Sequence, residues 1–440
     1  MKQKNKFYNK KYAHFDIRKN YSDYKKYIEN PKRIKSHGFY PFIRYEIKFV
    51  KYNSKNNSLE SKGKREKTRE IMYSSHIDRY IYKYYSELLN EHYNIITSEY
   101  GINEASIAYR NNMQGKSNIN FAKEVIDFIR HTEKSYIIVG DFEKFFNNLN
   151  HKYLKDRICD LLKADKLPDD HYAVYKNITK YSWIELDSIE KVLGKSRKKL
   201  NKKLINTKLF QTKEFHGIKK QYLKINKTGI GIPQGSSISA LYANTYMLDF
   251  DREINNYVKA HKGIYRRYCD DFIVVIPINN EDNYTNKYSN FIFDTVEDIP
   301  NLTLSRDKTK EYLYEAERLT WNNSENLLLD YLGFSFNGKE VRIREKSITK
   351  FYYKLHRKIN RINKKSEVNN RKCLRRGLYR GYSHLGAEKN KNGFGNFITY
   401  ANRSQKIFDE NSFTDNKMKY QVKNHWKTIN NKIIKKKREI

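Results

Sequence analysis

Three aspartates stand where acidic side chains are costly, within or at the end of apolar segments. Asp141 directly follows the β-branched run at 136–139, and Asp270 and Asp271 interrupt the apolar stretch at 264–276. Carboxylate oxygens are hard ligands that suit Mg²⁺, which completes its coordination with water and phosphate oxygens. Two such ions about 3.5–4 Å apart could activate an attacking hydroxyl and stabilise a departing pyrophosphate. The alternative is that Asp270-Asp271 is an ordinary turn dipeptide, which the pair alone would favour.

Regular elements are predicted around each acid, and rigid strand ends suit the geometry of a metal site. The run at 136–139 is typical of a buried strand, and 264–276 is predicted to be a hairpin with the two aspartates in its middle. Residues 53–68 are predicted to be a charged loop, and residues 174–228 a polar, basic insertion. Further helices are predicted at 72–93, 121–129, 150–163 and 237–251, and a strand-like segment at 327–336.

The charge of the chain indicates a polyanionic partner. Among its 440 residues, 88 Lys and Arg stand against 50 Asp and Glu, a formal net charge of +38. A folded protein rarely carries so much self-repulsion without a polyanion to offset it, and nucleic acid is the usual one. A membrane surface is the competing partner, but the sequence contains no long basic helix with a clean apolar face. A merely alkaline surface is the plain alternative.

The last hundred residues hold more than half of this charge. Residues 341–440 carry 28 Lys and Arg against 7 Asp and Glu, a net charge of +21. Helices are predicted at 348–362 and 420–437, and the apolar positions Phe351 and Leu355 indicate that this segment folds onto something. We therefore expect an α-helical clamp for nucleic acid, the alternative being a solvated basic tail.

The cysteines and the apolar runs argue against other classes of protein. Cys159, Cys269 and Cys373 are widely separated and form no CxxC pair, so neither a zinc ribbon nor a disulfide framework is expected. The polar start, MKQKNKFYNKK, is unlike a secretory signal. No apolar run approaches the ~18 residues of a membrane span. We therefore expect a cytoplasmic protein with no membrane partner.

Five short segments within residues 136–338 carry distinctive patterns in a fixed order. They are VGDFEKFF at 139–146, GIGIPQGSSIS at 229–239, YCDD at 268–271, SRDKT at 305–309 and YLGFSF at 331–336. They resemble, in that order, the first palm motif, the PQG box, the YxDD box, the Lys-Thr element and the primer-grip hairpin of reverse transcriptases. Each is weak or moderate singly, and together they make a strong resemblance.

The resemblance implies an α+β fold shaped like a right hand, with fingers, an RRM-like antiparallel palm and an α-helical thumb. The expected boundaries are an N-terminal extension at 1–60, fingers at 61–135, a palm at 136–340 and a basic α-helical thumb at 341–440. Within the palm, a basic finger-like insertion is expected at about 165–228.

The resemblance also assigns roles to the acids and their neighbours. Asp141 and Asp270 would ligate two Mg²⁺ ions, with Mn²⁺ as a possible substitute, and Asp271 would support them. The backbone carbonyl of Phe142 would add a further ligand. Phe146 would be a steric gate that excludes a ribose 2′-hydroxyl, the alternative being a plain core phenylalanine. Nucleotide contacts are implied for Arg69, Arg110, Phe146, Gln234 and Lys308, and template or primer contacts for Gly235, Tyr268 and Gly333.

Two of these implied roles have ordinary alternatives. Lys308 could neutralise the triphosphate or protonate pyrophosphate, but a solvated loop lysine is nearly as good an interpretation. Arg69 and Arg110 carry the guanidinium fork that suits phosphate oxygens, yet the chain offers 88 cations from which to choose.

A finer resemblance concerns bacterial defence-associated reverse transcriptases. It is carried by HIDRYIYKYY at 76–85, SIAYR at 106–110 and NFITYA at 396–401, while signatures of mobile-intron and retron enzymes are not found. It implies antiphage defence, with cDNA made from an RNA template and dNTPs. It also implies a structured noncoding RNA partner, and a second reverse transcriptase or a homo-oligomer as further possible partners.

Two other functions stay open at this point. One is an RNA-associated polymerase that makes untemplated or homopolymeric DNA on the same fold. The other is an RNA-binding scaffold with an idle catalytic centre, against which the presence of all three aspartates argues.

Overall fold

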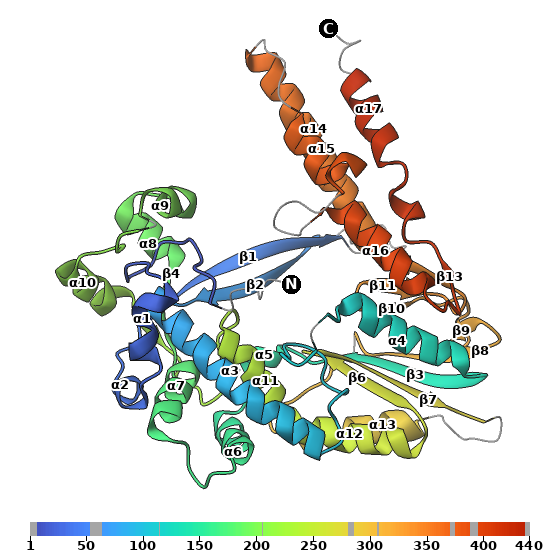
Figure 1. The fold of residues 1–440 in the computed structure, drawn as a ribbon, viewed down its shortest axis with the longest axis horizontal. Helices are drawn as coiled ribbons and strands as arrows, with labels where there is room; N and C mark the ends of the chain where they lie inside the picture. The colour runs from blue at the N-terminus through green and yellow to red at the C-terminus, as the bar shows by residue number, and fades with distance from the viewer. Residues whose placement is uncertain are drawn as a thin grey trace.

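The described residues form helices and three sheets, a mixed α+β protein as expected (Figure 1). The computed structural model describes residues 7–52, 64–113, 115–204, 206–279, 286–305, 308–369, 375–387 and 395–435. Arg306 and Asp307 of the SRDKT segment, and residues 53–63 of the predicted loop, lie outside the described residues.

A five-stranded antiparallel sheet carries the three aspartates. Its strand order is β6-β7-β3-β8-β9. The strands are β3 (Lys134–Asp141), β6 (Ile264–Tyr268), β7 (Asp271–Pro277), β8 (Lys310–Glu315) and β9 (Arg318–Thr320). The predicted strand at 136–139 and the predicted hairpin at 264–276 are therefore confirmed.

Both faces of this sheet are covered, which explains why its central strands are apolar without alternation. Tyr136 and Ile138 belong to a buried cluster that includes residues of α12 (Leu248–Ala260) and α13 (Lys287–Glu297). Ile137, on the opposite face, belongs to a second cluster with α4 (Asn118–His131). Figure 1 shows α4 on one side of the sheet and α12 and α13 on the other.

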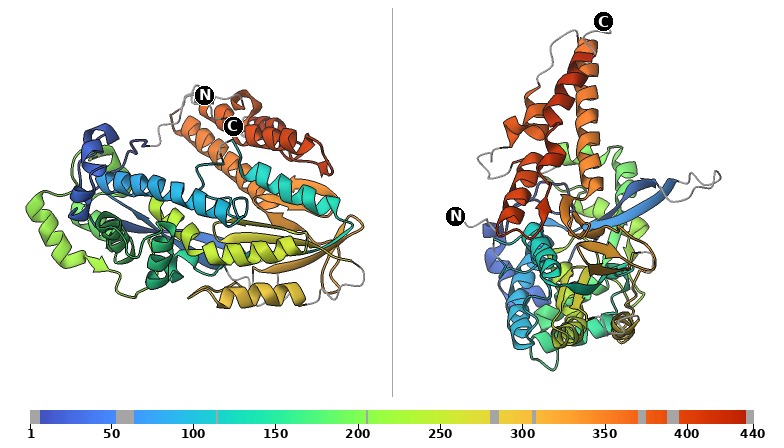
Figure 2. Two further views of the ribbon diagram at one scale, coloured as in Figure 1. Left: turned by 60° about the horizontal axis from the view of Figure 1, so that its bottom comes forward. Right: turned by 90° about the vertical axis from the view of Figure 1, so that its right-hand side faces the viewer.

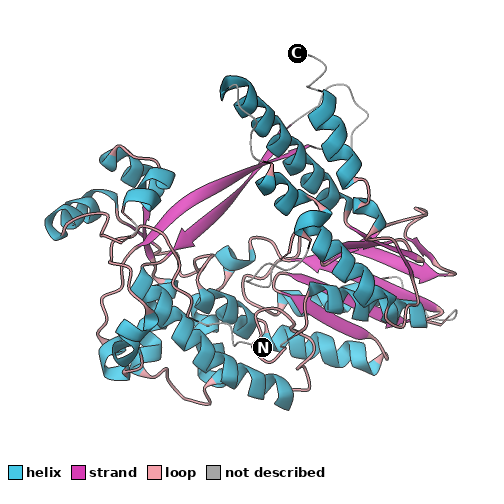
Figure 3. Cartoon of the chain, turned by 45° about the horizontal axis from the view of Figure 1, so that its top comes forward, coloured by secondary structure: helices cyan, strands magenta, loops and turns pink. Residues whose placement is uncertain are grey.

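A second sheet, in the N-terminal half, is built on a long hairpin. Strands β1 (Phe42–Tyr52) and β2 (Lys64–Tyr73) pair with each other, and β4 (Ser182–Glu185) runs parallel to β1. The short β5 (Lys224–Ile225) completes the order β2-β1-β4-β5. Figure 3 shows this hairpin apart from the strands that carry the aspartates. The helices α1 (Tyr21–Ile28), α2 (Pro31–Lys35), α7 (Asp169–Thr179), α8 (Leu186–Leu193), α9 (Arg197–Lys203) and α10 (Thr212–Tyr222) belong to the same half of the molecule.

Three predicted boundaries were wrong. Residues 64–68 were predicted to be loop, but they pair with β1 as part of β2. The helix predicted at 72–93 is α3 (His76–Glu99), because Met72 and Tyr73 still belong to β2. The helix predicted at 237–251 is two helices, α11 (Ser237–Tyr246) and α12, which part at Met247 because α11 packs on α3 and α6 (His151–Leu161) while α12 packs on β6 and α13.

The C-terminal part combines a small sheet with projecting helices. Its sheet has the order β10-β11-β12-β13, with β10 (Leu329–Tyr331), β11 (Phe334–Phe336), β12 (Glu340–Ile343) and β13 (Asp415–Asn416). The helices α14 (Glu345–Asn369), α15 (Arg376–Tyr382) and α17 (His425–Lys435) form what we call the C-terminal arm, which projects from the body of the molecule (Figures 1 and 2). A further helix, α16 (Phe397–Asp409), packs against α4.

The C-terminal arm has a small apolar core of its own. Leu355 and Ile359 of α14 meet Leu378 of α15 and two isoleucines of α17, so the predicted folding of this segment onto something is confirmed. Within the described part of the helix predicted at 420–437, a short 3₁₀ turn at Tyr420–Val422 precedes α17. At the division, the Nδ1 atom of His425 lies 2.7 Å from the carbonyl oxygen of Val422. Within the described residues, no helix has the length and apolar character to cross a membrane.

Candidate active site

Asp141, Asp270 and Asp271 meet at one end of the five-stranded sheet. Asp141 is the last residue of β3 and Asp271 is the first of β7, and the antiparallel register places them directly opposite each other. Asp270 lies in the turn between β6 and β7, where its carbonyl accepts the N–H of Phe142 at 3.2 Å. The fold thus brings together acids from two distant segments of the sequence.

The turn between β6 and β7 is held in an unfavourable backbone conformation. Cys269 has a φ of 65°, in the left-handed region that a residue with a Cβ rarely adopts. Tyr268, which pairs with Asp271 across the turn, is half-buried, and Cys269 is buried. Burial, with a contribution from Asp270, raises the pKa of the Cys269 thiol to about 12. This cysteine therefore stays protonated and serves the packing of the turn.

A buried ion pair supports this turn from behind. Arg267 and Asp251 of α12 have side chains that are 0% exposed, and two hydrogen bonds join them, Nε to Oδ1 at 2.7 Å and Nη2 to Oδ2 at 2.6 Å. The Nη1 atom of Arg267 donates to the carbonyl of Cys269 at 2.8 Å. The guanidinium therefore fixes the residue that directly precedes Asp270.

The sequence did not reveal either member of this pair. The available signal was an acid on an otherwise apolar helix face at 237–251 and an arginine within the apolar hairpin. Neither pattern shows that the two side chains meet, because the contact joins different elements of the fold.

The residue before Asp141 must be glycine because of its neighbour on β7. Gly140 pairs with Phe272, and a Cβ built on Gly140 would lie 2.3 Å from the Phe272 ring. The ring therefore covers the backbone of β3 immediately beside the catalytic end of the strand. Phe142, on the other side of Asp141, buries its ring against Phe250 and Phe272.

Burial and neighbouring negative charge raise the pKa of Asp271. Asp271 keeps exposed surface, yet loss of hydration at the packed strand end raises its pKa to about 6. The charges of Asp270 and Asp141 add to this rise, while Lys308 and Arg344 oppose it. Three carboxylates in this arrangement favour a bound cation, which would lower the repulsion among them.

The carboxylates of Asp141, Asp270 and Asp271 are ligands of the kind that a divalent cation binds, although they do not already surround a single point. Among the residues that the structure describes, no three Asp, Glu, His or Cys side chains converge closely enough to hold a metal ion. The Nζ of Lys308 instead pairs with Oδ2 of Asp141, and Oδ1 of Asp141 is buried with no hydrogen-bond partner. A buried carboxylate oxygen without a partner is costly. A divalent cation would satisfy it and would compete with the Lys308 ammonium for Asp141.

The loop that contains Gln234 and Gly235 is tied to the end of β2. The carbonyl of Gln234 accepts the N–H of Met72 at 3.0 Å. Gly235 has a φ of +121°, and a Cβ there would lie 2.4 Å from the Met72 carbonyl oxygen. The close approach requires glycine at this position.

The two adjacent phenylalanines after Asp141 have different surroundings. Phe145, in α5 (Phe145–Asn148), is 3% exposed and belongs to the main core. Phe146 is half-buried at the edge of that core, and its carbonyl accepts the N–H of Ile232 at 2.8 Å. Phe145 is therefore the structural phenylalanine, which leaves Phe146 available for contact with a substrate.

The sequence profile of the family described as "Reverse transcriptase (RNA-dependent DNA polymerase)" matches residues 55–336, well over half of the chain. The chain belongs to the reverse transcriptase family. Its polymerase fold and the catalytic character of the matched domain follow from this membership.

Solved telomerase structures show similarity at low sequence identity. Apo telomerase of Candida tropicalis, truncated from its C-terminal domain, is 14% identical with a TM-score of 0.41, over 61% of this chain and 51% of that one. Telomerase of Candida albicans, in complex with a TWJ fragment of telomeric RNA, is 12% identical with a TM-score of 0.44, over 94% of this chain and 65% of that one. The chain thus spans about half to two thirds of the length of these telomerases. No curated protein matches the sequence.

The two arginines expected to contact the nucleotide, Arg69 and Arg110, have contrasting environments in this reverse transcriptase. Arg69 is exposed on β2, opposite Ile47 of β1. Arg110 is instead held by the protein: it donates to Asn94 at 2.9 Å, to Thr97 at 3.0 Å and to Asn103 at 2.6 Å. Arg69 is therefore free to meet a phosphate, whereas Arg110 would first have to leave these acceptors.

The Gly333 turn is fixed by two neighbouring helices. Gly333 has a φ of +93° between β10 and β11 and accepts the N–H of Arg344 at 3.0 Å. Asn118 of α4 donates to the adjacent carbonyl of Leu332 at 3.0 Å and to the hydroxyl of Tyr400 at 3.1 Å. This turn is part of the small C-terminal sheet, a different sheet from the one that carries the aspartates.

Tyr109 is a site residue that the sequence did not reveal. Its ring is 52% exposed, and its φ of 59° is left-handed. Loss of hydration raises the pKa of its hydroxyl, with further contributions from Cys269 and Asp270, so this side chain lies beside the YCDD turn. An exposed aromatic side chain with an unfavourable backbone conformation at a catalytic centre suits contact with a substrate.

Proposed function

We propose that this chain is an RNA-directed DNA polymerase that makes cDNA. The observation that carries the proposal is the direct pairing of Asp141 with Asp271 at the strand ends, with Asp270 in the adjoining turn. Two Mg²⁺ ions bound there, or Mn²⁺ in their place, would supply activation of a 3′-hydroxyl and stabilisation of pyrophosphate. Asp141, Asp270, Asp271 and the Phe142 carbonyl would hold them.

The protein's own groups would orient the reactants. The Lys308 ammonium, which pairs with Asp141, would move to the negative charge of an incoming triphosphate once a cation takes its place. The half-buried ring of Phe146 would lie against C2′ of the sugar and exclude a 2′-hydroxyl. Gln234 and Gly235 would form the floor for the template and the incoming base, and Arg69 would bind phosphate oxygens.

We assign the parts of the fold to a right hand. The palm would be the five-stranded sheet with its helices, within 136–340, and the thumb would be 341–440 with the C-terminal arm. The fingers would include the β1–β2 hairpin and the segment at about 165–228, because β4 of that segment pairs with β1. The predicted borders at 60 and 135 remain predictions.

We further propose that the polymerase acts in antiviral defence with a structured noncoding RNA as its template. The support is the resemblance of residues 76–85, 106–110 and 396–401 to defence-associated reverse transcriptases, together with the net charge of +38. A second reverse transcriptase or a second copy of this chain is a further candidate partner. Synthesis of untemplated or homopolymeric DNA is the competing function.

The test is nucleotide incorporation by the purified full chain with Mg²⁺, with and without RNA that copurifies. Wild type is compared with the variant Asp270→Asn plus Asp271→Asn, for which we expect a loss of about 10³-fold or more, corresponding to several kcal/mol of transition-state stabilisation. Asp294→Asn plus Asp298→Asn, two exposed acids near the end of α13, is the matched control and should retain full activity.

Two outcomes test the catalytic acids and the kind of synthesis. Unchanged incorporation by the Asp270 and Asp271 variant would refute the assignment of the catalytic acids. Sequencing of the product separates the competing functions, since a complement of the copurifying RNA indicates templated synthesis and a homopolymer indicates the alternative.

A further inference from the structure

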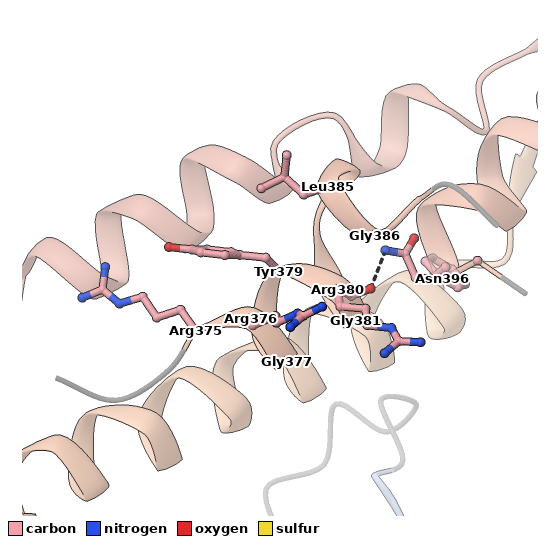
Figure 4. Close-up of a pocket in the computed structure, with 11 residues that line it drawn as sticks. Arg375, Arg376, Gly377, Tyr379, Arg380, Gly381, Leu385, Gly386 and Asn396 are labelled. Atoms are coloured by element: carbon pink, nitrogen blue, oxygen red, sulfur yellow. Dashed lines mark hydrogen bonds between the residues drawn. The ribbon is translucent and has the colours of Figure 1, made fainter. Parts of the chain in front are cut away.

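A cleft of about 960 Å³ lies in the C-terminal arm, away from the residues assigned to catalysis. It is formed by α15, by the 3₁₀ turn His384–Gly386 and by the start of α16 (Figure 4). A volume of this size is in the range of ligand-binding clefts. The residues that line it are cationic, aromatic or glycine for the most part, which is a composition suited to an anion with flat apolar groups.

Three arginines of this cleft have no acidic partner. Arg375, Arg376 and Arg380 line it, and none of their guanidinium groups forms an ion pair or a hydrogen bond with another residue that the structure describes. Arg267, in the palm, has all of its charge matched by Asp251. Two of these arginines are adjacent at the start of α15 and the third lies about one turn further along. Their unmatched guanidinium groups repel one another, and phosphate groups would relieve this repulsion.

Two glycines of α15 leave its backbone accessible within the cleft. Gly377 and Gly381 stand about one turn apart, and a Cβ added to either would meet no atom within 4 Å. Packing among the described residues gives no reason for glycine at either position. Glycine also weakens a helix relative to alanine, so its presence here needs another explanation. Glycine here would permit the close approach of a ligand to the helix backbone.

Apolar groups complete the lining of the cleft. Leu385 is 62% exposed, and the rings of Tyr379 and Phe397 line the same space. Unpaired bases can stack on such rings, whereas a duplex keeps the faces of its bases covered. The combination of arginines, accessible backbone and rings therefore favours a single strand over a duplex.

We propose that this cleft, which we call the arginine cleft, binds single-stranded RNA. Arg375, Arg376 and Arg380 hold its phosphates, and Tyr379 stacks with a base. Phe397, whose ring stacks on Phe351, adds an apolar wall to the cleft. The inference rests on the proposed function, in which the RNA template has an unpaired part outside the catalytic centre. Single-stranded DNA shares the phosphate and base chemistry, so the test includes it as a separate arm.

The first test is fluorescence anisotropy with the full chain and labelled single-stranded RNA, single-stranded DNA of the same sequence, and an RNA–DNA duplex. For Arg376→Gln plus Arg380→Gln we expect about tenfold weaker binding of single-stranded RNA and a salt slope that falls by about 1.4, from two lost phosphate contacts. Lys25→Gln plus Lys26→Gln removes the same charge from exposed positions of α1 and should change the affinity by less than about twofold.

The second test uses the glycines, because it separates binding from stability. Gly377→Ala plus Gly381→Ala should raise the melting temperature, since alanine favours the helix. The same variant should bind single-stranded RNA several-fold more weakly, because two methyl groups occupy the space of the ligand. A raised melting temperature with unchanged RNA binding would overturn the proposal.

Further outcomes of the binding measurements would contradict a site for single-stranded RNA. A loss for the arginine variant no larger than for the lysine control, or an equal loss on the duplex, would contradict a single-strand site. A loss on single-stranded DNA alone would overturn the assignment to RNA. Equilibrium binding requires no catalysis, so an inactive wild type would count against the proposed function and leave this measurement readable.

Discussion

The end of the five-stranded sheet and the C-terminal arm hold charge in opposite ways. At the sheet end, the fully buried Asp251 and Arg267 are joined by two hydrogen bonds, and Arg267 also holds the Cys269 carbonyl beside the three acids. The Phe272 ring covers the backbone at Gly140. In the C-terminal arm, Arg376 and its neighbours line an open cleft without acidic partners among the described residues. The proposed roles would explain this difference, because chemistry needs atoms fixed within fractions of an ångström, whereas a polyanion is attracted over longer distances.

The sheet end and the C-terminal arm also differ in the apolar clusters that stabilise them. The sheet end is embedded in the two large apolar clusters, and its polar groups are paired inside them. The C-terminal arm relies on a small cluster centred on Leu355, Ile359 and Leu378. We therefore expect substitutions at the sheet end to act on folding and on chemistry together, and substitutions in the arm to act mainly on binding.

The largest expected effect concerns salt and the arm. Six to ten phosphate contacts imply that nucleic-acid affinity falls by roughly 10³–10⁵-fold between 50 and 200 mM salt. Titrations of the full chain at several salt concentrations measure this slope. Asp270→Asn plus Asp271→Asn should show nearly the same slope, because these acids make no phosphate contact of their own. Salt-insensitive binding would contradict the view of the arm as a charge-based surface.

The next effect concerns the buried pair behind the catalytic turn. Arg267→Met leaves the buried Asp251 carboxylate without its cation, with the Tyr265 hydroxyl as its remaining side-chain donor, and should lower the free energy of unfolding by about 3–5 kcal/mol. The matched control is Arg157→Met, whose partner Asp249 is partly exposed, and which should cost less than about 1 kcal/mol. Chemical denaturation measures both.

A second variant tests whether Arg267 has a positioning role beyond stability. Arg267→Met plus Asp251→Leu removes both charges and should recover much of the lost stability. We expect kcat for nucleotide incorporation to stay low in this double variant with little change in KM, because the Cys269 carbonyl has lost its donor. Recovery of kcat together with stability would show that the pair has a purely structural role.

A smaller effect on stability distinguishes Gly235, which the fold requires, from Gly217, which it does not. Gly235→Ala places a methyl group against the Met72 carbonyl at an unfavourable φ and should destabilise the protein by about 1–3 kcal/mol. Gly217→Ala, in α10, meets no atom within 4 Å and should stabilise it by up to about 1 kcal/mol. Melting temperatures compare the two, and equal shifts would contradict the close contact of the Gln234 loop with β2.

The smallest effect concerns the protonation of Asp271. Its pKa of about 6 lies above the ordinary value of 3.8, so the folded chain binds this proton more tightly than the unfolded chain. The associated stabilisation is therefore full below the ordinary pKa and is lost as pH rises through the folded value. Activity that needs the ionised form should fall as pH is lowered through about 6.

Lys308→Gln sharpens the pH prediction. Lys308 opposes the rise in the Asp271 pKa, so its removal should move the acid limb of the pH–activity profile to higher pH. Lys310→Gln, an exposed lysine two residues away, is the control and should leave the limb in place. An acid limb that moves equally in both variants would show that general charge, rather than the pair with Asp141, sets the pKa.

Sequence patterns identified the three acids that the fold brings together better than they identified the borders of the elements around them. Asp141, Asp270 and Asp271 could be found because acids within apolar strands are costly and therefore conspicuous. The strands around them were predictable for the same reason, as both faces of this sheet are buried and its strands are continuous apolar runs. The division at Met247 could not be predicted, because it depends on which neighbours α11 and α12 pack against.

Sequence patterns could not predict the contacts that support the site. Arg267 looked like one cation among 88 until the fold brought it to Asp251. Arg110 looked suited to phosphate, and only the fold shows that Asn94, Thr97 and Asn103 already occupy its donors. In both cases the decisive information is which partners a side chain meets across elements, and local spacing does not carry it.

The most direct measurement is extension of a DNA primer on a defined RNA template by the full chain with Mg²⁺, followed by sequencing of the product. The proposed function predicts a product complementary to the template with wild type. It also predicts that this product falls by about 10³-fold or more with Asp141→Asn, since that residue faces Asp271 at the catalytic end of the sheet. Template-independent product from wild type, or undiminished complementary product from Asp141→Asn, would contradict it.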